Sequence, residues 1–146
     1  MTNIIMGGYP NYIYFYGPMS LRFPTEERLK SKKRIQQLFE EGSFIVDFPI
    51  KLLYLDASGL EVVTKMGVSV PKKNFKRAVD RNRIKRLLRE SYRLHRQHIF
   101  NKTERPYALM FLYLGKEIPE YAKLEAHMIK ILGLFLKKIN NEEVPK

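Results

Sequence analysis

The sequence predicts a single α/β domain, an α+β sandwich with the element order helix, strand, strand, helix, strand, helix. Apolar residues recur at helical spacing in three long segments, and three other segments have the composition of strands. The length of 146 residues suits one domain with one hydrophobic core. Because a strand–helix–strand succession implies a parallel pair, we expect a mixed sheet.

The first helix is expected between Thr25 and Gly42. Thr25 can cap its first turn, where Glu26 and Glu27 suit the positive end of the helix dipole. Apolar residues then recur near helical spacing, at Leu29, Ile35, Leu38 and Phe39. A glycine such as Gly42 is typical of the position just beyond a helix.

Two strands are expected next, over 50–55 and 60–70. The residues between them, Asp-Ala-Ser-Gly, have the composition of a turn. Alternation in the second strand places Met66 and Val70 on one face and Lys65 on the other. The two strands are therefore predicted to form an antiparallel hairpin that Pro71 closes.

The remaining elements are a helix over 78–97, a polar loop over 101–106, a strand over 107–114 and a last helix over 119–139. The strand is almost entirely apolar, which predicts a central place in the sheet. The last helix is predicted to bury six apolar side chains: Leu124, Met128, Ile131, Leu132, Phe135 and Leu136.

The domain is predicted to occupy residues 21–139, followed by a polar tail over 140–146. Residues 1–20 form an uncharged, tyrosine-rich extension, which we expect to be disordered or an added edge strand. Met19 closely precedes the first charged residue, Arg22. Translation is therefore expected to begin at Met19, which would make residues 1–18 an upstream in-frame extension.

The composition excludes several classes of protein. There is no cysteine, so disulfides and thiolate chemistry are excluded. No apolar run approaches the roughly 18 residues that span a bilayer, and the N-terminal segment lacks the basic residues of a signal peptide. We expect a cytoplasmic protein with no membrane partner and no obligate protein partner.

Positive charge is concentrated in one segment. The chain has 27 Lys and Arg against 15 Asp and Glu, a net charge of +12 that is typical of a polyanion binder. Residues 71–97 hold eleven basic and two acidic residues, a net +9. Spacings of three or four residues align five of them as a ridge on the predicted helix: Arg81, Lys85, Arg89, Arg93 and Arg96. Like charges at this spacing repel by about 0.2–0.5 kcal/mol per pair, which favours nucleic-acid binding over a merely solvated face.

The segment Arg81-Asn82-Arg83-Ile84-Lys85-Arg86-Leu87-Leu88-Arg89-Glu90 resembles the signature helix of the bacterial ribonuclease P protein family. Gly67-Val68-Ser69-Val70-Pro71-Lys72-Lys73 resembles the family's strand that ends in a lysine pair, and Leu29-Lys30, Phe39 and Gly42 resemble its first helix. The likeness covers roughly residues 21–136. It implies a ribosomal-protein-like RNA-binding fold with a left-handed strand–helix–strand crossover, although about 98% of such crossovers are right-handed.

The resemblance implies a protein subunit of the ribonuclease P ribonucleoprotein, which binds the catalytic RNA and the 5′ leader of precursor tRNA and assists 5′-end maturation. The implied RNA-binding residues are Lys72, Lys73, Arg77, Arg81, Asn82, Arg83, Lys85, Arg86, Arg89 and Arg93. The implied leader cleft, between the first helix and the open sheet face, contains Ile35, Phe39, Leu53 or Tyr54 according to register, and Lys65. Aromatic rings there would stack on any base.

Two positions depart from the family's pattern. Ile35 stands where the family has a second aromatic residue on the first helix, and core packing is the simpler interpretation for it. Phe75-Lys76-Arg77 stands where the family often has a glycine before Ala-Val. These departures affect the expected leader contacts more than the expected RNA binding.

No catalytic or metal-binding site is predicted in the chain. Its three histidines, His95, His98 and His127, lack the cysteine or carboxylate neighbours of a metal site, and no nucleotide-binding or nucleophile motif is present. The resemblance implies that Mg²⁺, held mainly by the RNA subunit and the substrate, performs the hydrolysis. Three alternatives remain: a ribosomal protein or general RNA chaperone, an autonomous nuclease, and a membrane-surface protein.

Overall fold

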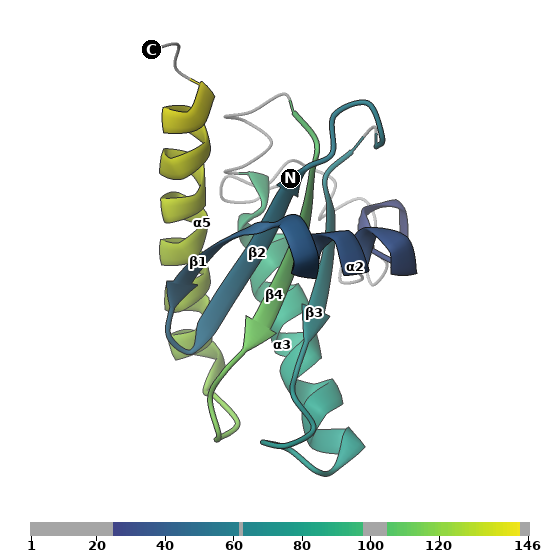
Figure 1. Cartoon of the computed structure of the whole chain (residues 1–146). Coiled ribbons are helices and arrows are strands. Elements are labelled where there is room, and N and C mark those ends of the chain that lie inside the picture. Colours follow the sequence, from purple (N-terminus) through teal and green to yellow (C-terminus); the bar gives the residue numbers. More distant parts are fainter. Residues whose placement is uncertain (1–24, 62, 98–104, 144–146) are drawn as a thin grey trace, which may run out of the picture.

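A four-stranded mixed sheet lies between one helix on its first face and two helices on its second (Figure 1). The structure, a computed structural model, describes residues 25–61, 63–97 and 105–143. The strands are β1 (Ser43–Asp47), β2 (Ile50–Asp56), β3 (Lys65–Ser69) and β4 (Tyr107–Tyr113), in the spatial order β1-β2-β4-β3. The helical elements are the 3-10 turn η2 (Thr25–Glu27), α2 (Lys32–Glu41), α3 (Ala78–His95) and α5 (Tyr121–Glu143). The predicted α/β class with a mixed sheet is confirmed.

The crossover between β3 and β4 is left-handed. The two strands are parallel neighbours, whereas the β1–β2 and β2–β4 pairs are antiparallel. In Figure 1 both strands point down, β3 lies to the right of β4, and α3 connects them behind the sheet. This is the exceptional handedness that the family resemblance implied.

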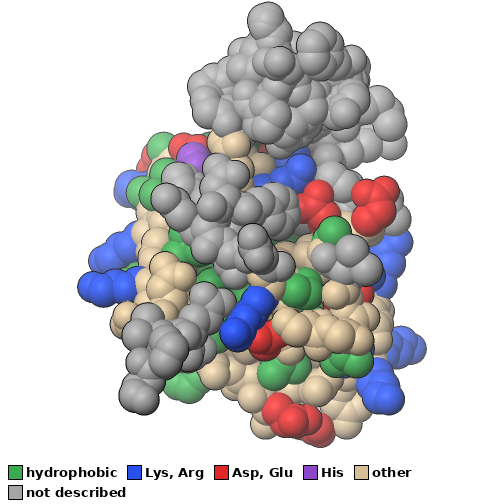
Figure 2. All heavy atoms as spheres, turned by 90° about the horizontal axis from the view of Figure 1, so that it is seen from above, with side chains coloured by type: hydrophobic (Ala, Val, Ile, Leu, Met, Phe, Trp, Pro, Cys, Tyr) green, Lys and Arg blue, Asp and Glu red, His purple; other side chains and the backbone are tan. Residues whose placement is uncertain are grey.

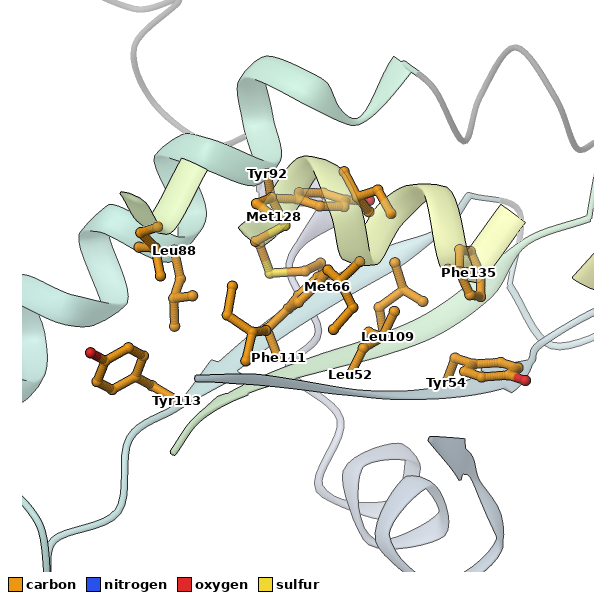
Figure 3. Close-up of a cluster of buried hydrophobic side chains, with 14 of the residues drawn as sticks. Leu52, Tyr54, Met66, Leu88, Tyr92, Leu109, Phe111, Tyr113, Met128 and Phe135 are labelled. Atoms are coloured by element: carbon orange, nitrogen blue, oxygen red, sulfur yellow. The ribbon is translucent and has the colours of Figure 1, made fainter. Parts of the chain in front are cut away.

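Strand alternation divides the apolar residues into two clusters. On the second face, side chains such as Leu52, Leu109 and Phe111 pack beneath α3 and α5 (Figure 3). On the first face, a smaller cluster holds α2 on the sheet: Leu29, Leu38, Leu53, Ala108 and Met110. Full burial of a leucine or methionine side chain contributes roughly 1.5–3 kcal/mol. The sheet therefore has one fully covered face and one that only α2 covers.

The first helix begins later than the sequence predicted. Ser31, not Thr25, is its N-cap, and the Ser31 hydroxyl accepts a hydrogen bond from the Arg34 backbone N–H at 3.2 Å. Residues 28–29 instead extend along β3, where the Leu29 N–H donates to the Met66 carbonyl at 2.9 Å. Because these residues pair with a distant strand, they do not form the helix that the local sequence predicts. The predicted end at Gly42 is confirmed.

The predicted hairpin was wrong. β2 pairs with β1, a strand that was not predicted, and β3 pairs with β4 rather than with β2. Alternation identifies a strand but not its partner, and the β3–β4 pair is made across α3. β3 is also shorter than the predicted 60–70: it spans Lys65–Ser69, and residue 60 belongs to the turn over 58–60.

The later elements agree with the sequence. α3, a central β4 and α5 are all present, and the six predicted inward side chains of α5 lie against the core. α5 continues to Glu143, four residues beyond the predicted end. The predictions for residues 1–20, including Met19, and for most of the 101–106 loop lie outside the described residues. Within the described ranges, no helix is both long and apolar enough for a membrane span.

Candidate nucleic-acid interface

One side of α3 packs on the core, and the other carries the basic motif. Ile84, Leu88, Ser91 and Tyr92 are fully buried beneath the helix. The predicted RNA-binding side chains lie exposed or half-buried on α3 and on the loop before it, and we call this set the basic surface: Lys72, Lys73, Arg77, Asn82, Arg83, Lys85, Arg86 and Arg89. The structure therefore brings together eight of the ten predicted RNA-binding residues as surface groups.

Arg81 has an intramolecular role at the start of α3. Its Nη1 atom donates to the carbonyl oxygens of Phe75 at 2.7 Å and Lys76 at 2.9 Å. These hydrogen bonds tie the loop that carries Lys72 and Lys73 to the helix. Sequence reasoning assigned Arg81 only to RNA, because a local pattern does not show which carbonyl groups a side chain will reach.

Two cations at the C-terminal end of the predicted ridge are buried. Arg93 is 3% exposed and pairs with Glu90, with Arg93 Nη2 2.6 Å from Glu90 Oε1. Arg96 is 8% exposed, and its Nη1 lies 3.1 Å from Oε1 of Glu27. Because Arg93 is almost completely buried and pairs with Glu90, it does not lie on the basic surface with the other predicted RNA-binding residues. The exposed ridge thus consists of Lys85 and Arg89 with Asn82, Arg83 and Arg86 beside it.

Arg28 adds a cation that the sequence analysis did not assign to this surface. Partial burial lowers the pKa of the Arg89 guanidinium, and the nearby charge of Arg28 lowers it further. Arg28 is exposed and is placed there by its bridge to Met66 on β3. Its position depends on a contact between segments far apart in the sequence, so spacing alone gave no signal for it.

The predicted leader residues fall on both faces of the sheet. Ile35 packs half-buried on the α2 cluster with Leu53, which is 7% exposed, whereas Phe39 is 54% exposed. Lys65 lies on the same face, and its Nζ is 3.2 Å from Oε1 of Glu61. Packing is thus the role that the structure shows for Ile35.

Tyr54 is a correction to the predicted cleft. It lies on the opposite face of the sheet, 3% exposed, where its ring meets Phe135 of α5 edge-on with 5.1 Å between centroids (Figure 3). Adjacent residues of a strand point to opposite faces, so Leu53 beside α2 excludes Tyr54 from that side. Of the two residues that the sequence left open, the structure therefore places Leu53, and not Tyr54, on the face that α2 covers.

α2 leaves part of the first face uncovered. The cross-strand row Val46, Lys51, Leu112 and Ser69 lies beyond the row that α2 covers. Lys51, Ser69 and Leu112 are half-buried, and we call these three residues the open sheet face. Sequence reasoning missed this row because it missed β1, although the alternation Phe44, Val46, Phe48 was a signal for that strand.

The histidines have structural partners. His95 Nε2 lies 2.9 Å from Glu125 Oε2, and His127 Nδ1 lies 2.9 Å from Asp47 Oδ2. Within residues 25–61, 63–97 and 105–143, no group of three His, Cys, Asp or Glu side chains is arranged to hold a metal ion. His98 lies outside these ranges.

Basic and acidic side chains are mixed on parts of the surface outside the basic surface. Seen from above, the end of the domain away from the start of α3 carries both blue basic and red acidic side chains (Figure 2). The basic surface, by contrast, has Asp80 as its acidic neighbour, 3.9 Å from Arg77. The excess of positive charge therefore lies with the motif helix and its preceding loop.

Comparisons with known proteins agree with this arrangement. A family model described as Ribonuclease P matches residues 23–135. The ribonuclease P protein component of Porphyromonas gingivalis is 37% identical over 120 residues, which cover 79% of this chain and 87% of the relative. That of Chlorobaculum tepidum is 33% identical over 125 residues, covering 75% and 81%.

Solved structures share the fold. The RNase P protein of Staphylococcus aureus superposes with a TM-score of 0.63 at 20% identity, covering 74% of this chain and 94% of that one. The RNase P protein of Thermotoga maritima gives a TM-score of 0.60 at 19% identity, covering 73% and 94%. With the match of the family model to most of the domain, these likenesses establish that the chain belongs to the ribonuclease P protein family.

Proposed function

We propose that this chain binds the ribonuclease P RNA through the basic surface and holds the 5′ leader of precursor tRNA beside α2. The family is the protein component of ribonuclease P, a tRNA-processing ribonucleoprotein. The observation that carries the RNA contact is the display of seven cations and Asn82 on one helix and its preceding loop. Guanidinium groups bind phosphate in a fork, and an A-form RNA helix is recognised by shape, phosphate and 2′-OH.

The leader contact is carried by Phe39 and the open sheet face. The exposed Phe39 ring can stack on a base, and the ammonium group of Lys51 on the open sheet face can meet a phosphate. Stacking tolerates any base sequence, which suits leaders that differ between precursors. Ile35 of α2 packs against the cluster that contains Leu53, and this contact holds α2 on the sheet next to the site.

The chemistry is assigned to the RNA. We propose that Mg²⁺ held by the RNA subunit and the substrate performs hydrolysis, and that the protein is an accessory subunit. Its cations would offset repulsion between the phosphates of the enzyme RNA and those of the substrate. We also place this activity in the bacterial cytoplasm, which is consistent with a chain that has no cysteine.

The binding test compares two RNAs at the same salt concentration. The protein is titrated with a bacterial ribonuclease P RNA and with ribosomal RNA of similar length. We expect the ribonuclease P RNA to bind at least tenfold more tightly, with the preference lost when Arg83, Arg86 and Arg89 are changed to Ala. Equal affinity for the two RNAs would instead favour a general RNA chaperone.

A further inference from the structure

Three phenylalanine side chains are exposed along the chain from the last turn of α2, through β1, to the turn after β1. Phe39 is 54%, Phe44 55% and Phe48 65% exposed, and Val46 between the latter two is 47% exposed. The other phenylalanines of the described residues, Phe75, Phe111 and Phe135, are at most 7% exposed. A gathering of exposed apolar side chains marks a binding surface more often than a chance arrangement. This one lies at the β1 edge of the sheet.

The strand register makes this edge continuous with the face proposed to hold the leader. Phe44 lies opposite Leu53, whose side chain packs beneath α2, and Val46 lies opposite Lys51. Directly opposite residues share a face, so Phe44 and Val46 extend the open sheet face outward. The Nζ atom of Lys51 lies 4.6 Å from the centre of the Phe44 ring.

This arrangement suits a strand of RNA. The Lys51 ammonium orients the Phe44 ring by a cation–π contact and is available to a phosphate next to a stacked base. Phe44 is the second residue of β1 and Phe48 lies in the turn just after it, so at most about 13 Å of chain separates the two residues. Stacked bases rise about 3.4 Å each, so the two rings span several nucleotides.

We propose that Phe44 and Phe48 bind further bases of the single-stranded leader, beyond those held at Phe39. We call these two residues the edge aromatic pair. This inference rests on the proposed leader function and extends it to β1. Ile35 presents no flat ring on α2, and the edge aromatic pair supplies one ring on β1 and one in the turn after it. The chain would thus contact a longer leader than α2 alone allows.

Charge selects RNA over a second copy of this chain as the occupant. Each copy carries a net charge of +12, so two copies docked through β1 would bring their cations together, whereas RNA would neutralise Lys51. The last turn of α2 carries Glu40 and Glu41, both exposed, so the phosphates are expected on the Lys51 side of the rings.

The test uses the ribonucleoprotein assembled with a bacterial ribonuclease P RNA and precursor tRNAs that differ only in leader length. Phe44 and Phe48 are changed to Leu together, which keeps apolar bulk but removes the flat rings. A second double variant, Phe44→Tyr with Phe48→Tyr, keeps the rings. Ile129→Leu, at a position 44% exposed on α5, is the control for an exposed apolar substitution away from β1.

For the long leader we expect the double Leu variant to bind at least about fivefold more weakly than wild type, the lower bound for losing one base–ring stack. The Tyr variant and Ile129→Leu should match wild type, and a short leader should bind all four proteins equally. Because the substituted side chains are exposed, the urea midpoints of the free proteins should agree, which separates a binding defect from misfolding.

Three results would overturn the inference. The double Leu variant could bind the long leader as wild type does, while Phe39→Leu still weakens it, which would confine the leader to α2. It could weaken short and long leaders equally. Sedimentation of the free protein could show a dimer that a Phe44→Asp variant disperses, which would assign the edge to a second copy. If wild type itself shows no dependence on leader length, the proposed leader function fails as well.

Discussion

Arg81 donates from Nη1 to the carbonyl oxygen of Phe75 at 2.7 Å and thereby joins the first arginine of the motif helix to the loop before it. A second hydrogen bond from the same atom reaches the carbonyl of Lys76 at 2.9 Å. The loop bearing Lys72 and Lys73 is therefore held in place relative to α3 before any RNA binds. Pre-organisation of this kind lowers the entropy lost on binding.

Changing Arg81 to Ala should destabilise the free protein, and changing Arg83 to Ala should not. A hydrogen bond to a charged donor contributes about 1.5–3 kcal/mol, and partial exposure of Arg81 reduces this to about 1 kcal/mol. Arg83 is exposed, so its substitution should stay within about 0.5 kcal/mol. Urea unfolding without RNA measures both. Identical midpoints for the two variants would show that the Arg81 hydrogen bonds do not hold the loop.

The salt dependence of RNA binding should distinguish exposed from buried arginines. Removing Arg86 should make the slope of log K against log salt shallower by about 0.7–0.9, because one fewer phosphate counterion is released. Arg93→Gln should leave that slope unchanged. It should lower the free energy of unfolding, because it breaks the ion pair with Glu90, in which the Arg93 side chain is only 3% exposed. A shallower slope for Arg93→Gln would return that residue to the RNA contact.

Phe39 and Tyr54 should behave in opposite ways. Phe39→Leu should weaken the binding of leader-bearing precursor and leave stability nearly unchanged, because the ring is 54% exposed. Tyr54→Leu should lower the free energy of unfolding by about 1–3 kcal/mol and leave leader affinity of the folded fraction unchanged. Leader titrations paired with urea unfolding check both. A specific leader defect in a stable Tyr54→Leu protein would contradict the placement of this side chain beneath α5.

Asp47 should make the stability of the protein depend on pH in the acidic range. Burial alone would raise the pKa of its carboxyl group, but the hydrogen bond with His127 and the charge of Lys130 outweigh burial and lower the pKa. A lowered pKa in the folded state gives stability that is present above the unfolded value, about 3.9, and lost as pH falls through the folded value. These contacts tie the edge strand β1 to α5, with Lys130 Nζ 3.4 Å from Asp47 Oδ1.

Asp47→Asn should therefore be less stable than wild type at pH 7. The difference between the two proteins should shrink as the pH falls below about 4. Urea midpoints across this range measure it, with Glu120→Gln as a control because Glu120 is 76% exposed in its pair with Lys123. A gap that stays constant down to pH 3 would rule out the Asp47 carboxylate as its source.

The sequence predicted elements well where the local signal and the tertiary fold agree. The α3 and β4 segments carry strong, uninterrupted patterns, and both form as predicted. The region from Thr25 to Ser31 carries a helix-start signal, yet Arg28 and Leu29 pair with β3 because that strand offers backbone partners. Likewise β3 and β4 become partners across an intervening helix, which local alternation does not encode.

The candidate site was predictable to a similar extent. The motif located the basic surface, because helical spacing fixes which side chains share a face. It did not show that Arg93 would pair with Glu90 and Arg96 with Glu27. The Arg96–Glu27 ion pair joins segments far apart in the chain. The resemblance placed Leu53 or Tyr54 in the cleft, and only the register of β2 decided between them.

Precursor-tRNA cleavage at low Mg²⁺, with a bacterial ribonuclease P RNA and with or without this protein, tests the central claim most directly. The account predicts that wild type restores cleavage at the mature 5′ end and that the Arg83, Arg86, Arg89 triple Ala variant does not. High Mg²⁺ should rescue the reaction without protein, because the metal can then offset the phosphate repulsion. If wild type leaves cleavage at low Mg²⁺ unchanged, or cleaves the precursor without the RNA subunit, the account is wrong.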